Sequence, residues 1–207
     1  MLSESKALPS LVESRRVTLE ILDGNGIRLV TTSVATEPFL CAVSNALVGN
    51  SLSNEVIEVE GELVFRCGAP VLAAVAGQST VQIGERFYKP WRALPIPPNK
   101  VVKVVTQGGL VYVALKGLKM LDTTGKNNAI ATACEFTHTP DLQARYIPEK
   151  FLHEYLKSLD NTTMLEGLLT KVLRHLKLAC EMASKGAKLV KVRIGTNFYE
   201  VWVNEIR

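Results

Sequence analysis

Hydrophobic residues in the first two thirds of the chain fall into many short runs, and glycine, proline or asparagine closes most of them. The runs are rich in valine and isoleucine: VIEVEGELVFR, PVLAAVAG, TVQIG, ERFY, VVKVVT and LVYVAL. Short β-branched runs with frequent turn residues are typical of a β-sandwich or a β-barrel. Prolines at 95, 97 and 98 forbid a central strand there and predict a loop before Val101.

Two elements are predicted ahead of that tract. The runs VTLEIL and IRLV flank Asp23-Gly24-Asn25-Gly26, and both Asp-Gly and Asn-Gly favour tight turns, so this stretch predicts a β-hairpin. Residues 37–48 place their apolar side chains at helical spacing, and Gly49 follows as a suitable C-terminal stop.

The pattern changes near residue 122, where polar DTTGKNN predicts a loop before a weak strand, AIATACEF. Pro148 suits the first turn of a helix that Asp160-Asn161 should end. Thr163 and Glu166 fit a capping box for a long second helix. That helix carries one apolar stripe: Leu165, Leu168, Leu169, Val172, Leu173, Leu176, Ala179 and Ala183. The alternating KLVKVRIGTNFYEVWVN then predicts a terminal hairpin.

Composition and charge exclude several classes of protein. The 207 residues carry a net charge of +4 without any Lys/Arg run, so we expect no nucleic-acid partner. The basic residues of 185–193 are interpreted as a solvated face. No apolar run is long enough to span a membrane, and the first residues lack the order of a secretory signal, so we expect no membrane partner. Four scattered cysteines without CxxC indicate a reducing, cytoplasmic location.

Searches for familiar catalytic motifs are negative. The sequence has no P-loop, no GxSxG and no dinucleotide fingerprint. His138, His153 and His175 lack partners at zinc-site spacing, so packing or surface roles are expected, with no metal site. Cys41 is interpreted as a buried, inert thiol. Four glutamates alternate with apolar residues and are interpreted as the solvent face of an edge strand: Glu55, Glu58, Glu60 and Glu62.

Three segments, in order, carry a family resemblance. They are SNALVGN at 44–50 with VIEV at 56–59, then VLAAVAG at 71–77, and then YKPW at 88–91 with the 95–99 loop and GLVYVALKG at 109–117. Together they resemble the biotin-dependent carboxyltransferase family, also called allophanate hydrolase subunit 2, over roughly residues 15–122. The sequence departs from the family where "QDxGRxG" and "GSRST" segments would stand, and Glu37 occupies the place of an aspartate in "GAMD".

Members of that family carry two cyclophilin-like barrel halves, and this chain has material for one. The resemblance therefore implies an α+β protein with an N-terminal cyclophilin-like β-barrel followed by a helical segment and a C-terminal β-hairpin. We expect a barrel domain at 1–139 and a helical segment with the hairpin at 140–207.

The resemblance also implies carboxyl transfer to a small amide or urea-like acceptor. It suggests Glu37 and Lys116 as catalytic residues, and Asn45, Asn50, Gly77 and Gln78 as substrate-binding residues. Each has a structural alternative in a turn, a helix end or a solvated strand. No cofactor is expected to be bound covalently, because the chain has no lysine motif for biotin attachment, and biotin would arrive on another protein.

Two functions stay open at this point: a carboxyltransferase or amide-hydrolase subunit, and a degenerate, non-catalytic barrel that binds a partner or ligand. A concave pocket lined by Glu37, Gln78 and Lys116 would favour the enzyme. Expected partners are a companion cyclophilin-like subunit or a biotin carrier protein, in a homo- or hetero-oligomer. The leucine-rich helix 163–185 would either form a homodimer or cover an open barrel end. The terminal hairpin would pair with the barrel or with a second chain.

Overall fold

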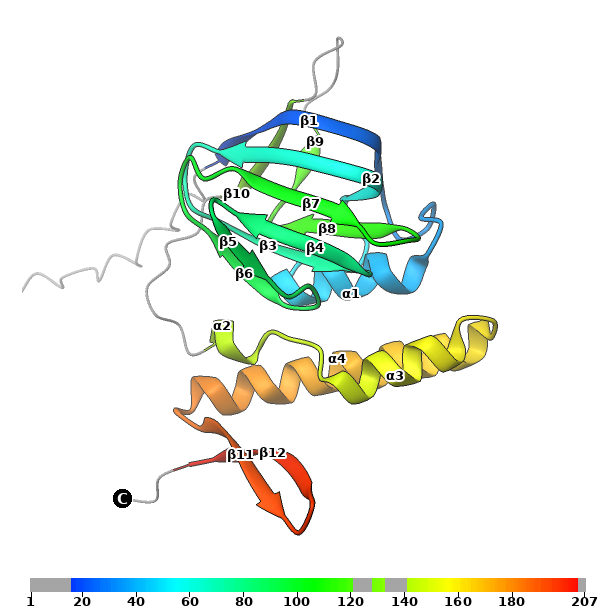
Figure 1. Ribbon diagram of the computed structural model, residues 1–207, viewed down its shortest axis with the longest axis vertical. Helices are drawn as coiled ribbons and strands as arrows, with labels where there is room; N and C mark the ends of the chain where they lie inside the picture. Colours follow the sequence, from blue (N-terminus) through cyan, green and yellow to red (C-terminus); the bar gives the residue numbers. More distant parts are fainter. Residues whose placement is uncertain (1–15, 121–127, 133–140, 205–207) are drawn as a thin grey trace, which may run out of the picture.

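The computed structural model describes residues 16–120, 128–132 and 141–204, and it shows a curled sheet above a layer of helices (Figure 1). The strands are β1 (Arg16–Val30), β2 (Val56–Cys67), β3 (Val71–Ala76), β4 (Ser79–Ile83), β5 (Arg86–Tyr88), β6 (Ala93–Ile96), β7 (Val102–Thr106), β8 (Val111–Leu115), β9 (Lys119–Met120), β10 (Asn128–Thr132), β11 (Lys188–Ile194) and β12 (Asn197–Val203). The helices are α1 (Pro38–Val48), α2 (Asp141–Ala144), α3 (Glu149–Ser158) and α4 (Thr162–Ser184).

Ten of the described strands join one antiparallel sheet. The main path runs β5-β4-β7-β2-β1-β10-β9, while β8 pairs with both β2 and β3, and β3 pairs with β6. The long strand β2 therefore pairs with β8 near its beginning and with β7 near its end, and the sheet curls there. The predicted β-rich body is confirmed, and Pro95 lies in β6, which pairs only with β3 among the described strands.

The sheet buries side chains on both faces of its middle strands. The concave face holds one apolar core that includes Phe65, Val75 and Val113. The convex face of β3 and β8 contributes Ala74 and Tyr112 to a second core, which α1, α3 and α4 complete. Burial on both faces explains why VLAAVA and VYVAL are continuous apolar runs instead of alternating ones.

Helix α1 lies directly against the convex face of the sheet. The predicted helix at 37–48 is confirmed, and Gly49 ends it in the left-handed conformation, with φ of +69°. The stripe of α4 is also confirmed, because Leu168, Val172 and Leu176 are buried. These side chains belong to the second core that α1 shares, so the stripe covers α1 and not an open end of the barrel.

The hairpin predicted around Asp23–Gly26 is wrong. Strand β1 continues through these residues and stays paired with β2, with register shifts between Ile21 and Asp23 and between Asn25 and Ile27. The turn-like residues accommodate bulges instead: Gly26 has a φ of +59°, and a Cβ there would lie 2.1 Å from the carbonyl oxygen of Glu60.

The capping box predicted at Thr163 is also wrong. Helix α4 begins earlier, and Asn161 is its N-cap: the Asn161 side chain accepts a hydrogen bond of 3.0 Å from the backbone N–H of Met164. An asparagine oxygen satisfies this free donor as well as a threonine hydroxyl does, so the residue expected to end α3 starts α4.

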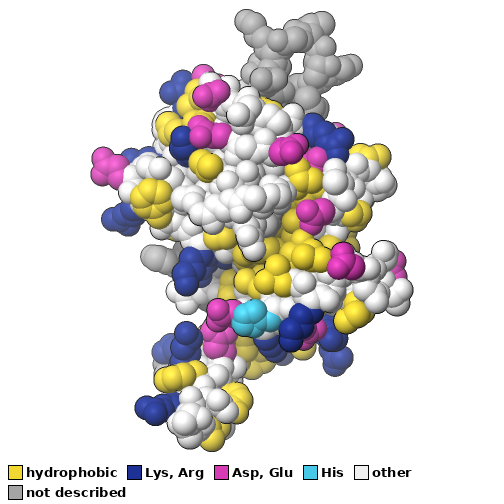
Figure 2. Space-filling view, turned by 45° about the vertical axis from the view of Figure 1, so that its right-hand side comes forward, with side chains coloured by type: hydrophobic (Ala, Val, Ile, Leu, Met, Phe, Trp, Pro, Cys, Tyr) yellow, Lys and Arg dark blue, Asp and Glu magenta, His cyan; other side chains and the backbone are white. Residues whose placement is uncertain are grey.

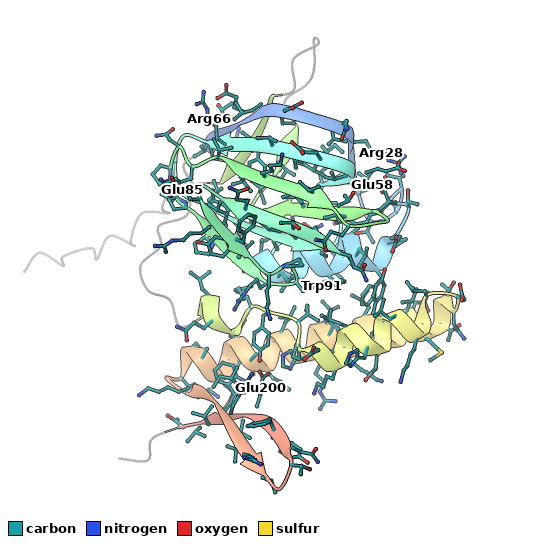
Figure 3. All side chains as sticks on the ribbon, in the orientation of Figure 1. Arg28, Glu58, Arg66, Glu85, Trp91 and Glu200 are labelled. Carbon is teal, nitrogen blue, oxygen red and sulfur yellow. The ribbon has the colours of Figure 1, made fainter. Side chains whose placement is uncertain are left out.

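The terminal hairpin β11–β12 is confirmed as an element. It forms a separate two-stranded sheet, and no described strand of the barrel pairs with it, so the expectation of pairing with the barrel is wrong. Trp202 packs against Ala179 and Ala183 of α4, and the Tyr146 hydroxyl donates a 2.5 Å hydrogen bond to Glu200. Figure 3 shows Glu200 between the hairpin and α4.

These elements confirm the α+β class, with a curled, cyclophilin-like half-barrel, a helical segment and a C-terminal β-hairpin. The division into 1–139 and 140–207 stays a prediction, because its boundary lies outside the described residues.

Candidate functional site

A cleft of about 430 Å³ lies between the sheet body and helix α3. The N-terminal end of α1 and three loops of the sheet body line one side with Glu37, Leu40, Gly77, Gln78, Trp91, Gly108, Gly109 and Leu110. Helix α3 and the residue after it line the other with Glu149, Leu152, His153, Tyr155, Leu156 and Leu159. Figure 2 shows hydrophobic side chains gathered between the sheet and the helices, with acidic side chains beside them.

The turn from β3 into β4 forms one wall of the cleft and requires glycine. Gly77 has a φ of +117°, and a Cβ on it would lie 2.7 Å from the carbonyl oxygen of Leu110. The backbone N–H of Gln107 donates to the carbonyl of Gln78 at 2.9 Å. The β3–β4 and β7–β8 connections are thereby held together, with the exposed Gln78 side chain at the cleft.

The β7–β8 connection supplies backbone donors. Gly108 and Gly109 both have positive φ, +87° and +83°, and no atom comes within 4 Å of a Cβ built on either. Within the described part of the chain, the N–H groups of these two glycines make no hydrogen bond. Exposed N–H groups at a glycine turn suit a ligand oxygen that carries negative charge.

Glu37 places a carboxylate at the cleft, and Tyr155 of α3 fixes its position. The Tyr155 hydroxyl donates to Oε2 of Glu37 at 2.6 Å, while its ring stacks on Phe39 at 5.0 Å between centroids. Burial, and then the hydrogen bond to Glu37, raise the pKa of Tyr155, so the hydroxyl stays a donor. No described residue donates to the other oxygen of this carboxylate.

A buried glutamate lies behind Glu37. The expectation that Glu58 faces solvent is wrong, since the residue is 3% exposed. Its carboxylate accepts hydrogen bonds from the Arg28 guanidinium at 2.5 Å and from the Tyr112 hydroxyl at 2.6 Å. The same hydroxyl accepts the backbone N–H of Glu37 at 2.7 Å. Figure 3 shows Arg28 and Glu58 side by side at one edge of the sheet body.

The structure brings together only part of the site inferred from the sequence. Glu37, Gly77 and Gln78 line the cleft. Asn45, Asn50 and Lys116 lie at the other end of α1, which spans roughly 16 Å at the usual helical rise. The segments VGN and VAG are likewise separated, because the pairing of β3 with β8 sets Lys116 beside Leu72 and Gly77 beside Leu110.

Asn50 and Lys116 hold the C-terminal end of α1 to the end of β8, and Asn45 ties the helix to the loop before β2. Asn50 donates to the carbonyl of Leu115 at 2.9 Å and accepts from the N–H of Gly117 at 3.0 Å. Asn45 is fully buried and donates to the carbonyl of Asn54 at 2.8 Å. Lys116 donates to the carbonyl of Gly49. Their assigned roles in binding or catalysis stay predictions.

The concave pocket expected for an enzyme is present, but Lys116 does not line it. The described residues that line the cleft include Glu37 and Gln78 but neither a lysine nor an arginine. The lining side chains that can accept hydrogen bonds are the Glu37 and Glu149 carboxylates, the Gln78 amide and His153, and the donors are backbone N–H groups, the Gln78 amide, His153 and the Trp91 indole. This arrangement suits a small ligand that carries both N–H groups and a carbonyl oxygen.

The residues that close the cleft carry no sequence motif that would mark them as part of a site. Trp91 lies between the sheet and the helices, as Figure 3 shows, and it adopts a φ of +65°, which is strained for a side chain of its size. Its carbonyl accepts the N–H of Ile147 at 2.8 Å, which anchors the chain just before α3. Local patterns identify α3 as a helix but cannot place it against a sheet that is distant in the sequence.

Other chemistry is limited in the part of the chain described. No group of three His, Cys, Asp or Glu residues there could hold a metal ion. Cys41 is fully buried and free, and burial raises the pKa of its thiol, in agreement with an inert role. His138 and Cys134 lie outside the described residues. No helix among the described residues is long and apolar enough to cross a membrane.

Residues 30–132 match the family described as carboxyltransferase domain, subdomain A and B. No curated protein matches the chain.

Solved structures with a similar fold include the urea amidolyase of Kluyveromyces lactis, with a TM-score of 0.47 and 15% identity. The urea carboxylase of the same organism has a TM-score of 0.46 and 14% identity, and a protein called TTHA0988 has 0.47 and 16%. These alignments cover 53, 58 and 60% of this chain, in the same order. The chain spans only 8, 12 and 32% of the three structures.

Proposed function

Because residues 30–132 match the carboxyltransferase-domain family, we propose that the cleft binds a small amide or urea-like acceptor for carboxyl transfer. The observation that carries this proposal is the Glu37 carboxylate, held by Tyr155 on one oxygen and open to a ligand on the other. The glycine turn at 108–109 provides N–H donors at the same cleft. An amide or urea presents the matching groups, N–H and carbonyl.

The residues of the cleft also fit the ureido head of biotin, which likewise has N–H groups and a carbonyl oxygen. The volume of about 430 Å³ lies within the range of ordinary small-molecule sites. Biotin supplies the carboxyl group when it is bound, and we propose that another protein carries it into the cleft. A biotin carrier protein or a companion cyclophilin-like subunit is therefore the proposed partner, in the cytoplasm.

In this proposal the residues of the chain orient the acceptor and manage its proton. The free oxygen of Glu37 would accept an acceptor N–H and take that proton as the nitrogen gains its bond to the carboxyl carbon. The bond from that carbon to the donor nitrogen would break in the same transfer, and the proton held on Glu37 would return to the donor nitrogen. Gln78 and the N–H groups of Gly108 and Gly109 hold the acceptor carbonyl. Leu152 and Leu156 exclude water from the helix side. Tyr155 acts as a positioning residue through its hydrogen bond to Glu37.

A second function, ligand binding without catalysis, is favoured by one observation. The described residues lining the cleft provide no lysine or arginine to stabilise a carboxylate, and Lys116 donates to Gly49 instead. The two functions share the binding step and differ only in whether the acceptor is consumed.

The test is titration of the full chain with urea and with acetamide, followed by NMR and calorimetry. We expect amide resonances of residues 77 and 108–109 to shift, and Glu37→Gln to weaken binding at least about 10-fold through loss of a charged hydrogen bond. Glu60→Gln, at an exposed position on β2, is the matched control and should bind like the wild type. Unshifted resonances, or equal affinity in Glu37→Gln, would contradict the proposed site.

Transfer of an isotope-labelled carboxyl group from carboxybiotin to the bound acceptor then separates the two functions. Labelled product that requires Glu37 supports the carboxyltransferase. Binding without labelled product supports the non-catalytic module.

A further inference from the structure

One face of the β11–β12 hairpin is apolar except for Lys188 and Asn197 at its two ends. The strand register sets Val190 opposite Val201 and Val192 opposite Tyr199, so these side chains share one face. Ile194 and Val203 continue that face toward its two ends. All six side chains are between 38 and 64% exposed, and we call them the outer face of the hairpin. Figure 2 shows hydrophobic side chains at the surface of the hairpin, at the lower end of the molecule.

The other face of the hairpin contacts its own chain through Trp202 and Glu200, while Phe198, near the turn, is 69% exposed. Trp202 packs against Ala179 and Ala183 of α4, and Glu200 accepts the hydrogen bond from Tyr146. These contacts fix the orientation of the hairpin and point the outer face away from the rest of the molecule. A two-stranded sheet is marginally stable in water unless an apolar face is covered, and a contiguous exposed apolar patch marks an interaction surface.

We propose that the outer face is the contact surface between two copies of this chain. Its six side chains expose on the order of 500 Å² per copy, so packing two faces together removes about 1,000 Å² from water, which reaches the lower limit for a specific interface. A face of this composition is complementary to itself, as a two-fold symmetric contact requires.

The positions of the charged residues favour face-to-face packing of two hairpins over edge-to-edge pairing. The only charged residue on this face is Lys188, at the open end of the hairpin. A two-fold axis that lies between the two faces, perpendicular to the strands, places each Lys188 opposite Ile194 of the partner subunit, so the two ammonium groups lie at opposite ends of the contact. Edge-to-edge pairing of two β11 strands would instead bring Lys191 and Arg193 against like charges, which is unfavourable. The copies therefore meet face to face.

The test is the molar mass of the full chain, measured by light scattering and sedimentation between about 1 and 100 μM. We expect a concentration-dependent dimer. Val201→Lys should raise its dissociation constant at least about 100-fold, because an ammonium group would be buried at the centre of the contact. Val192→Lys, on the neighbouring strand, should act alike. Val34→Lys makes the same change at a valine that is 64% exposed before α1, and it should leave the dimer unchanged.

Far-UV circular dichroism, and tryptophan fluorescence measured in a Trp91→Phe background that leaves Trp202 as the single tryptophan, establish that each variant keeps its hairpin on α4. A single-chain mass at every concentration would overturn the proposal, and so would wild-type dimerisation in Val201→Lys. Stable capture of a different protein on this face by a monomeric wild-type chain would also overturn it. The outcome is independent of the cleft, whose residues lie on other elements.

Discussion

Glu58 keeps a charged carboxylate inside the second core because hydrogen-bond donors surround it. Arg28 and Tyr112 donate to its two oxygens, and the backbone N–H of Thr36 adds a third hydrogen bond at 3.0 Å. Burial by itself raises the pKa of Glu58, but these hydrogen bonds outweigh it and hold the pKa below its ordinary value of 4.5. The charged form is therefore the stable one at neutral pH.

This balance predicts the acid sensitivity of the fold. Since the pKa of Glu58 is lower in the native state than in the unfolded chain, its contribution to stability is complete above about pH 4.5 and is lost as the pH falls through the native pKa. We expect urea unfolding to show this loss in the wild type. Glu58→Gln should cost about 1–3 kcal/mol at pH 7 and show a flatter acid dependence. Glu60→Gln serves as the exposed control, and parallel pH curves for Glu58→Gln and wild type would refute the assignment.

At the scale of the element, the ends of α4 depend on short-range hydrogen bonds. Asn161 satisfies the first free N–H of the helix, and the backbone N–H groups of Lys185 and Gly186 bond back to carbonyls of its last turn. The chain between α3 and α4 is short, so the cap also fixes where the second helix starts.

Replacing each of the two candidate N-cap residues by alanine shows which of them caps α4. Asn161→Ala should lower the free energy of unfolding by about 1 kcal/mol, because the Met164 N–H loses its acceptor. Thr163→Ala removes the hydroxyl of the expected capping box and should change stability by less than about 0.5 kcal/mol. Thermal and denaturant unfolding measure both, and an equal loss in the two variants would count against Asn161 as the cap.

Elements with a strong local period were predictable from the sequence, and those whose environment depends on distant segments were not. The apolar stripe of α4 predicts a helix, and the alternation of apolar and polar residues in β11 and β12 predicts two strands. Asp23–Gly26 has the chemistry of a tight turn and of a β-bulge alike, and only pairing with β2 decides between them. Glu58 alternates like a solvent-facing residue, but α1, which precedes it in the chain, covers that face of the sheet.

At the scale of the whole molecule, the second core joins the barrel to the helices. It contains Leu40 and Val48 of α1, Tyr112 of β8, and Phe151 and Leu168 of the later helices. The segment before α3 also pairs with the barrel, since the Ala93 N–H donates to the carbonyl of Arg145 at 2.8 Å. Half of the candidate site was predictable, because Glu37, Gly77 and Gln78 lie within the 15–122 span of the resemblance, whereas Tyr155 lies outside it.

A shared core predicts joint unfolding of the described parts. Leu168 is 2% exposed, and Leu168→Ala should cost about 2–5 kcal/mol through lost burial and a cavity. Barrel and helices should still unfold in one transition, so tryptophan fluorescence and far-UV circular dichroism should coincide. Leu178→Ala, at a half-exposed position on the same helix, is the control with little expected loss. Two separated transitions would show that the helices unfold independently of the barrel.

Helix α3 faces the cleft from outside the 30–132 segment. Substitutions at a few positions on the cleft side of α3, such as Glu149 and His153, would therefore change which ligands the cleft accepts. The strands of the sheet would not have to change. Phe151 and Tyr155 of the same helix are excluded from such change, because they belong to the core that the helices share with the barrel.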